Sequence, residues 1–444
     1  MIAFDIDKQT LNDLEIFGSD NNQKSLFSLF NRTCTIEGSS TLKVIFKNPL
    51  NNIELISERK NLIECLQKSE VDFTQDKDNI DFIEFYLRQN NRPKKPSLSF
   101  KFRKIVGDYI KPTRELYLQR RGVKEVLDLI TFLDNLFSQL NFKRDFSFLK
   151  RLDNLIISVK NNKHISKYLT QGKFKLTSSK LSVLDFEIRT IELNKIKEVL
   201  TLLYELDAYF AVAKTANKFY LTYPVVNNDE DQSIEIKGLR HLFIDNAVSN
   251  NIVISATKNV SFITGVNMAG KSTLLKSIAI AVYLAHLGFP VPADRMITSV
   301  FNGLITTINI SDNLSVGYSH FYNEVRRVKE VAKRIDECKK MLVIFDELFR
   351  GTNVKDAHEA SVSIINAFSK IKNSLFLVST HIIEVAEDLD ENRNIDFNFL
   401  ETKMIDGKPN FTHKLIAGIT ADRMGLWIIQ NEGILEILGK NANR

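Results

Sequence analysis

The chain has 444 residues, of which 44% are hydrophobic, so it is long enough for two or three domains and is not an intrinsically disordered protein. Its 60 Lys and Arg and 54 Asp and Glu give a formal charge of +6, which is only mildly basic. No apolar run is long enough to cross a bilayer, no signal peptide is evident, and the three cysteines lack metal-ligand spacing, so we expect a cytoplasmic protein with no membrane partner and no disulfide framework.

The N-terminal half is predicted to be helical. Apolar residues recur at steps of three and four, most clearly from Leu181 to Ala213, and no Gly or Pro falls between Lys173 and Tyr223. This pattern predicts one long helix from about Ser178 to Ala216, which would act as a structural lever and needs a partner helix.

Two stretches of this half are rich in positive charge. Eleven Lys or Arg and two acids lie between Arg92 and Lys124, and ten Lys or Arg and two acids lie between Lys143 and Lys180. Such stretches can bind a polyanion with an affinity that falls as salt rises. A solvated helix face is the alternative explanation of the same charges.

A polar loop at residues 227–232 ends the helical half. After it, short β-branched runs at 252–254, 260–264, 342–345 and 375–379 alternate with helical segments. Alternation of this kind predicts a mostly parallel sheet with helices on its faces. The fold class is therefore multidomain, with an all-α domain over residues 1–226 and an α/β domain over residues 235–444.

Residues 265–273 read Gly-Val-Asn-Met-Ala-Gly-Lys-Ser-Thr and lie between an apolar strand and a helix, which is the setting of a phosphate-binding loop. Gly265 and Gly270 allow backbone N–H groups to point at phosphate oxygens, and the helix N-terminus adds partial positive charge. Lys271 is predicted to neutralise the β- and γ-phosphates and Ser272 to ligate Mg²⁺. A chance match in a glycine turn is the alternative.

Two other predicted strands end in polar side chains. The strand at 341–345 leads into Asp346 and Glu347, and the strand at 374–380 leads into His381. Beside a phosphate loop, Asp346 would hold Mg²⁺ directly or through water, and Glu347 would orient or deprotonate the attacking water. His381 would reach the γ-phosphate or that water. Surface acids at a strand end and a structural histidine are the alternatives.

Ser319 lies between the loop and these strands, just after a turn at Gly317. It is predicted to cap a helix that runs on through Val331. The alternative to a simple cap is that Ser319 also receives the γ-phosphate bound by a second subunit. The full set of predicted nucleotide-binding residues is Gly265, Val266, Asn267, Met268, Ala269, Gly270, Lys271, Ser272, Thr273, Asp346 and, in trans, Ser319.

These motifs together resemble the MutS family of DNA mismatch-repair ATPases, which are relatives of the ABC ATPases. The resemblance covers nearly the whole chain and rests on residues 265–273, 290–293, 319–324, 346–353, 379–381 and 238–241, with weaker likeness at 38–59 and 206–224. The chain departs from the family pattern at Val266, His320 and Phe349, where the family has proline, threonine and glycine. It also lacks the family's adenine-stacking aromatic at residues 247–250.

The resemblance implies a helical core and lever domain followed by a P-loop, ABC-type ATPase domain that closes as a homodimer on nucleotide. Its cofactors would be ATP and Mg²⁺, with Lys271, Glu347 and His381 as catalytic residues and Ser272 and Asp346 as Mg²⁺ ligands. It further implies binding of double-stranded or branched DNA in DNA repair or recombination. We expect a trimmed member without the N-terminal mismatch-recognition domain. An ATP-driven dimerisation switch acting on a protein or RNA partner is the alternative.

Overall fold

The computed structural model describes residues 3–18, 24–69, 71–91, 93, 95, 114–141, 145–170, 177–308, 320–349, 351–405, 408–420 and 431. The chain forms two compact units. A sheet unit contains Met1–Leu29, Asn48–Lys60 and Phe219–Arg444, and a helical unit contains Phe30–Lys47 and Asn61–Lys218. These compact units differ from the domain boundaries expected at 226 and 235, because two N-terminal segments pack with the C-terminal part of the chain.

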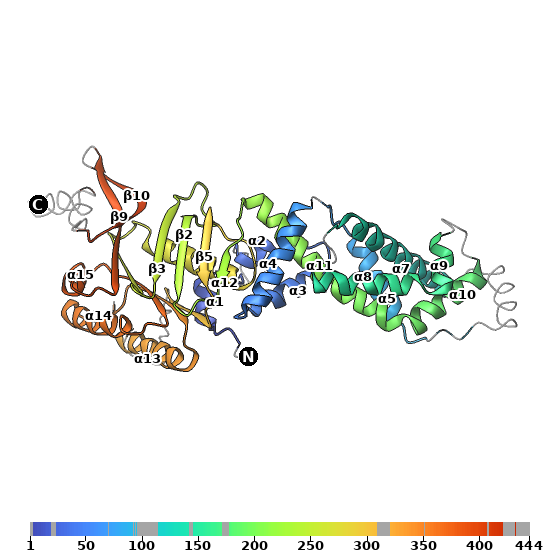
Figure 1. Ribbon diagram of the computed structural model, residues 1–444, viewed down its shortest axis with the longest axis horizontal. Helices are drawn as coiled ribbons and strands as arrows, with labels where there is room; N and C mark the ends of the chain where they lie inside the picture. Colours follow the sequence, from blue (N-terminus) through green and yellow to red (C-terminus); the bar gives the residue numbers. More distant parts are fainter. Residues whose placement is uncertain are drawn as a thin grey trace, which may run out of the picture. The chain divides into compact units, whose positions relative to one another are not determined.

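The helical unit is centred on α7, which packs against α5, α8, α9 and α10 (Figure 1). Apolar side chains of α7 recur at helical spacing and are buried, including Val123, Val126, Ile130 and Leu133, so burial of one stripe holds the bundle together. The helices are α3 (Ile36–Lys47), α4 (Ile53–Lys68), which begins in the sheet unit, α5 (Lys77–Arg88), α7 (Arg114–Gln139), α8 (Ser147–Lys160), α9 (Lys163–Thr170), α10 (Ser178–Phe186) and α11 (Leu193–Phe219).

The predicted single helix from Ser178 to Ala216 is wrong in its middle. A π-helical turn, η1 (Glu187–Ile191), separates α10 from α11, and the N–H of Glu192 bonds to the carbonyl of Glu187, five residues back. A buried network lies beside this turn: the Asp185 carboxylate accepts hydrogen bonds from Tyr86 at 2.6 Å and from Arg189 at 2.8 Å. Arg189 lies within the turn, but Tyr86 is 99 positions away from Asp185, so local periodicity gave no sign of the wider turn.

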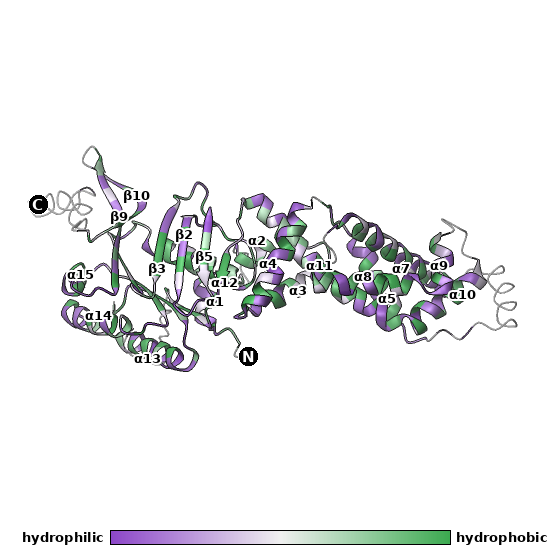
Figure 2. Cartoon of the chain, in the orientation of Figure 1, coloured by the Kyte–Doolittle hydropathy of each residue, from purple (hydrophilic) through white to green (hydrophobic). Residues whose placement is uncertain are grey.

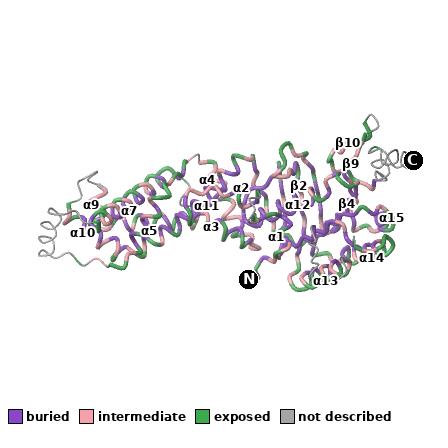
Figure 3. Tube along the Cα trace, turned by 180° about the vertical axis from the view of Figure 1, so that it is seen from behind, coloured by how far each residue is buried: buried purple, intermediate pink, exposed green. Residues whose placement is uncertain are grey.

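The sheet unit contains a six-stranded sheet in the order β10-β9-β4-β8-β7-β6. All neighbouring pairs are parallel except β10 and β9, so the expected mostly parallel sheet is confirmed. The central strands β4, β7 and β8 are buried along their whole length, and Figure 3 shows the buried trace where β4 is labelled. The strands are β4 (Val260–Thr264), β6 (Gly303–Thr307), β7 (Met341–Asp346), β8 (Leu375–Ser379), β9 (Ile395–Ile405) and β10 (Lys408–Ala417).

A second, mixed sheet has the order β1-β5-β2-β3. Of its strands, only β3 is predicted by the β-branched runs of the sequence. Its strands are β1 (Val225–Asn227), β2 (Ser233–Leu239), β3 (Asn250–Ser255) and β5 (Arg295–Ser299).

Helices pack on the six-stranded sheet through apolar faces. α12 (Lys271–His286) is buried along nearly its whole length. α13 (His320–Cys338) carries both hydrophilic and hydrophobic residues (Figure 2), and it buries Val328, Val331 and Ile335. The remaining helices of the unit are α1 (Lys8–Asp13), α2 (Leu26–Phe30), α14 (Val354–Phe368) and α15 (Glu384–Leu389). Asn353 directly precedes α14, and its side chain accepts a hydrogen bond from the N–H of Asp356 and so caps the helix.

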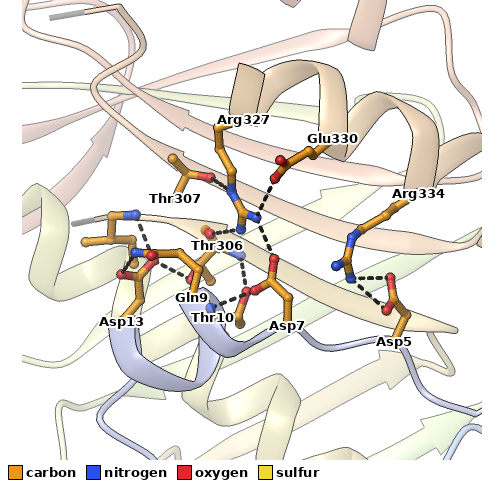
Figure 4. A network of polar contacts seen from close by, with 11 residues as sticks. Asp5, Asp7, Gln9, Thr10, Asp13, Thr306, Thr307, Arg327, Glu330 and Arg334 are labelled. Atoms are coloured by element: carbon orange, nitrogen blue, oxygen red, sulfur yellow. Dashed lines mark hydrogen bonds and ion pairs between the residues drawn. The ribbon is translucent and has the colours of Figure 1, made fainter. Parts of the chain in front are cut away.

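An N-terminal strap, residues 5–13, covers the β6 edge of this sheet (Figure 4). The N–H of Asp5 donates to the carbonyl of Asn302, and the N–H of Leu304 donates to the carbonyl of Asp5, so the strap adds a short parallel bridge to β6. The buried carboxylate of Asp13 accepts hydrogen bonds from the Thr306 hydroxyl and the Ile308 N–H. Backbone groups on the outer side of the edge strand β6 thus find hydrogen-bond partners in the strap.

Candidate nucleotide-binding site

The predicted site segments meet at one edge of the six-stranded sheet. Strand β8 lies between β4 and β7, and all three strands are parallel. Their carboxyl ends therefore lie next to one another, which is where ligands bind in open α/β sheets. The N–H of Thr380, just after β8, also bonds to the carbonyl of Ile263 in β4 at 3.3 Å. The glycine-bounded loop at residues 265–270, the two acids and His381 consequently extend from adjacent strands.

The loop at residues 265–270 joins β4 directly to α12. Gly265 has a φ of 145° and Gly270, the residue before the first helical turn, a φ of 104°, and a side chain would be strained in both conformations. The N–H of Ala269 bonds to the carbonyl of Val266 at 3.2 Å, which closes a tight turn. Met268 also has a positive φ, and 76% of its surface is exposed. The loop therefore has the curled backbone that phosphate binding needs.

Lys271 is buried at the start of α12, and its ammonium group lies inside the loop. Its Nζ donates to the carbonyl oxygen of Gly265 at 2.8 Å and lies 3.4 Å from that of Val266. It is also 3.7 Å from Oε1 of Glu347. Phosphate oxygens are stronger acceptors for an ammonium group than neutral carbonyls, so a bound phosphate would compete for this lysine.

Glu347 lies between Lys271 and His381. Its Oε2 is 3.5 Å from Nδ1 of His381, and its side chain is only 15% exposed, whereas that of His381 is 48% exposed. Glu347 has a φ of 58°, a left-handed conformation that costs a non-glycine residue roughly 1–2 kcal/mol. The Glu347 carboxylate therefore has the Lys271 ammonium group on one side and the partly exposed imidazole of His381 on the other.

Asp346 ends β7 and is 7% exposed. Its Oδ1 accepts a hydrogen bond from the hydroxyl of Ser379 at 2.5 Å. Ser272 and Thr273 lie in the first turn of α12, where Ser272 is exposed. Ser319 lies outside the described residues, and α13 begins directly after it, at His320.

The side chains present fit a magnesium ion held largely by phosphate. A serine hydroxyl and an aspartate carboxylate are oxygen ligands of the kind that Mg²⁺ takes together with substrate phosphates. Within the described part of the chain, no group of three or more His, Cys, Asp or Glu could hold a metal alone. The described residues therefore do not form a metal site made of protein ligands alone.

A pocket of about 390 Å³ lies beside the loop, within the size range of small-molecule sites. Its walls are mainly aliphatic, with two imidazoles and a few polar groups. The lining residues are Leu239, His241, Ile244, Asn246, Ala247, Val248, Asn250, Met268, Ala269, Gly270, Thr273, Leu274, Ser277, Leu400 and His413. Residues 247–248 offer only aliphatic contact, as expected, but the two histidines supply flat rings that the sequence did not suggest.

His413 is a site residue that sequence reasoning missed. The pairing of β9 and β10 shifts register between Phe411 and Leu415, and His413 lies in this irregularity with a φ of 55°. Its Nδ1 lies 2.8 Å from the carbonyl oxygen of Ala269, so the ring is fixed against the loop at residues 265–270. The two residues are 144 positions apart, and no local motif links them.

His241 enters the pocket from the loop after β2. Burial and the positive charge of Lys276 lower its pKa, and the charge of Glu15 offsets this only in part. The imidazole is therefore neutral at pH 7, which suits a flat contact with an uncharged aromatic ligand.

The departure at Phe349 has a structural consequence. Phe349 has a φ of 61° yet is buried, and its ring packs edge-on to Phe321 at 5.6 Å. The nearby carboxylate of Glu324 accepts a hydrogen bond from the N–H of Gly351 at 3.3 Å. The segment after the two acids is therefore anchored to α13 by an aromatic pair where the family pattern has glycine.

None of the helices that the structure describes is both long and apolar enough to traverse a bilayer.

Comparison with known proteins gives two family matches. The model for MutS domain III matches residues 9–213, and the model for MutS domain V matches residues 261–443. The chain is similar to the DNA mismatch repair protein MutS of Anaplasma phagocytophilum, with 31% identity over 227 residues, which is 50% of this chain and 27% of that protein.

Two other bacterial relatives show the same extent of similarity. The DNA mismatch repair protein MutS of Ehrlichia chaffeensis is 30% identical over 232 residues, or 52% of this chain and 28% of that protein. That of Streptococcus thermophilus is 28% identical over 280 residues, or 60% of this chain and 32% of that protein. The match thus spans about a third or less of each relative, while the two family models cover both units of the chain. The chain belongs to the MutS family.

Proposed function

We propose that the sheet unit binds ATP with Mg²⁺ and hydrolyses it to ADP and phosphate. The observation that supports this most strongly is the junction of β4 and α12, where the buried Lys271 lies inside a glycine-bounded loop 3.7 Å from Glu347. The loop N–H groups and the N-terminus of α12 would hold the phosphates, and Lys271 would neutralise the β- and γ-phosphates. Ser272 and Asp346 would hold Mg²⁺, which supplies charge neutralisation at the transferred phosphate when bound.

In the proposed reaction, Glu347 orients the attacking water and accepts its proton. His381, whose Nδ1 is 3.5 Å from the same carboxylate, would contact the γ-phosphate or the water. The adenine base would enter the pocket beside the loop, between its aliphatic wall and the rings of His241 and His413. The two histidine rings would then supply the flat contact to adenine that residues 247–250 lack.

At the level of the whole protein, we propose a DNA-binding ATPase of DNA repair or recombination that closes as a homodimer on nucleotide. The names of the relatives, which are DNA mismatch repair proteins, support this role. Ser319 of a second subunit would complete the site by contacting the γ-phosphate, and closure of the dimer would then depend on bound ATP.

The nucleotide assignment is tested with two substitutions in full-length protein. Lys271→Ala is expected to weaken ATP binding roughly tenfold to a hundredfold, because a charge-assisted contact to phosphate is lost. Glu347→Ala is expected to bind ATP but to lose turnover by roughly 10²–10⁴-fold. Binding is measured by calorimetry with magnesium nucleotide, and turnover by release of phosphate.

Lys258→Ala is the control, because Lys258 lies just before the opposite end of β4 and pairs with Asp396 at 2.6 Å. This variant is expected to bind and turn over ATP as the native protein does. Normal turnover by Glu347→Ala would show that another group activates the water. No heat of binding with the native protein would contradict the proposed ATPase function itself.

A further inference from the structure

Ser379, the last residue of β8, contacts both acids of the candidate site. It is fully buried, and it is the register partner of Asp346 in the neighbouring strand β7. Its hydroxyl donates to Oδ1 of Asp346 at 2.5 Å and accepts a hydrogen bond from the N–H of Glu347 at 3.2 Å. The Ser379 hydroxyl thus donates to the side chain of Asp346 and accepts from the backbone N–H of Glu347.

The contact to Asp346 restricts rotation of its carboxylate. A terminal carboxylate torsion is broad and has no strong preference of its own. In this buried setting, the donor from Ser379 determines which oxygen points towards β8. A ligand that binds through this carboxylate would therefore meet it already oriented, without the loss of rotamer freedom on binding.

The contacts to Glu347 hold its unusual backbone. Its N–H is shared between the carbonyl oxygen of Ser379 at 3.0 Å and the Ser379 hydroxyl at 3.2 Å. A positive φ at a glutamate persists only where the surroundings fix it. Because φ determines the direction of the Cα–Cβ bond, these two acceptors help to direct the Glu347 side chain between Lys271 and His381.

We propose that Ser379 is a positioning residue that orients the Asp346 carboxylate for Mg²⁺ and the Glu347 side chain for the attacking water. The inference rests on the proposed ATPase function, and it assigns a role at that site to a residue outside the phosphate loop and the acid pair. Loss of a hydrogen bond to a metal-binding carboxylate typically costs 10–100-fold in metal affinity or activity.

The test compares Ser379→Ala with Ser374→Ala in the full chain. Ser374 precedes the same strand, is equally buried, and its hydroxyl accepts a hydrogen bond from the N–H of Met341 at the opposite end of β7. The two variants therefore lose a comparable contact between the same two strands. Of these two serines, only Ser379 contacts Asp346 and Glu347. Ser374→Ala therefore measures the effect of losing a contact between the strands alone.

The readout is the Mg²⁺ concentration that gives half-maximal binding of a fluorescent ATP analogue. Ser379→Ala is expected to need roughly tenfold more Mg²⁺ than the native protein, with kcat lowered as well. Ser374→Ala is expected to match the native Mg²⁺ dependence, and Ser379→Thr, which keeps the hydroxyl, is expected to restore it. If Ser379→Ala does not fold, Ser379→Cys replaces it, because a thiol is a weak donor and should show the same shift.

An unchanged Mg²⁺ dependence in Ser379→Ala would overturn the inference, as would a shift in Ser379→Thr as large as that in Ser379→Ala. Failure of the native protein to bind the nucleotide at any Mg²⁺ concentration would instead contradict the proposed function. The two failures are distinguished by the native titration alone.

Discussion

His286 is a fully buried histidine whose two ring nitrogens both contact the backbone. Its Nε2 accepts a hydrogen bond from the N–H of Phe301 at 2.9 Å, and its Nδ1 lies 2.8 Å from the carbonyl oxygen of Val282. The first contact requires an unprotonated Nε2, so the ring is neutral with its proton on Nδ1. Burial lowers the pKa of His286 to about 4, and the bond to Val282 offsets this only in part.

We predict that this histidine makes the protein sensitive to mild acid. The unfolded state takes up the proton near pH 6.5 and the folded state only near pH 4, so the free energy of unfolding falls as pH drops through this range. The expected loss from His286 is about 2 kcal/mol between pH 7 and pH 5.

The measurement is chemical unfolding of the native protein and of His286→Gln at pH 7 and pH 5. The variant is expected to be less stable at pH 7 and to lose less stability on acidification, because glutamine does not titrate. Equal losses in the two proteins would show that His286 is not the source of the acid sensitivity.

At the scale of secondary-structure elements, the N-terminal strap joins β6 to α13 through two arginines (Figure 4). Arg334 contacts both oxygens of Asp5, at 2.8 and 3.0 Å. Arg327 donates to Oδ2 of Asp7 at 2.5 Å and to the carbonyl oxygen of Thr306 at 2.8 Å. These bonds connect the first residues of the chain to a helix more than three hundred positions later, a link that no local pattern predicts.

Asp7 allows the strap to be tested by pH. Burial alone would raise the pKa of Asp7, but the hydrogen bond and charge of Arg327, with hydrogen bonds from Thr10, outweigh burial and hold the pKa below its usual value. The pair therefore stabilises the fold above the unfolded pKa near 3.8, and this stabilisation is lost as pH falls through the lower folded value.

We predict that Asp7→Asn lowers the free energy of unfolding by about 2 kcal/mol at pH 7, because a largely buried charged hydrogen bond is lost while the cap on α1 is kept. The difference from the native protein should shrink below pH 4, where Asp7 itself becomes protonated. The matched control is Glu330→Gln, since Glu330 lies 3.8 Å from the same Arg327 but is 56% exposed. An effect as large as that of Asp7→Asn in the control would contradict the importance of the strap.

At the scale of the whole molecule, the local sequence pattern predicted the central strands of the six-stranded sheet, but it did not predict contacts between residues far apart in the chain. The runs at 260–264, 342–345 and 375–379 became β4, β7 and β8, because continuous apolar runs between polar turns are typical of buried parallel strands. From strand adjacency alone, the loop, the two acids and His381 could be expected at one sheet edge. His413 contacts Ala269, which is 144 positions away, and Asp13 bonds to Thr306, which is 293 positions away. No local periodicity predicts contacts over such separations.

The two basic stretches give the last prediction, which concerns DNA binding. In the second stretch, Arg151 pairs with Glu198 at 2.5 Å and Lys160 with Asp134 at 2.6 Å, which reduces the charge available to a polyanion. Most of the first stretch lies outside the described residues, and its sequence carries eleven Lys or Arg against two acids. We therefore expect the first stretch to supply the larger share of any phosphate contacts.

The measurement is a titration of branched, mismatched and perfect duplex DNA at several salt concentrations, with two double variants. Arg103→Ala with Lys104→Ala is expected to reduce the slope of log affinity against log salt by about 2, because each lost phosphate contact removes about 0.9. Arg151→Ala with Lys160→Ala is the control and should leave the slope nearly unchanged. Equal effects of the two variants would place the contacts on both stretches. No affinity of the native protein for any DNA at low salt would exclude DNA as the partner and would favour a switch that acts on a protein or RNA.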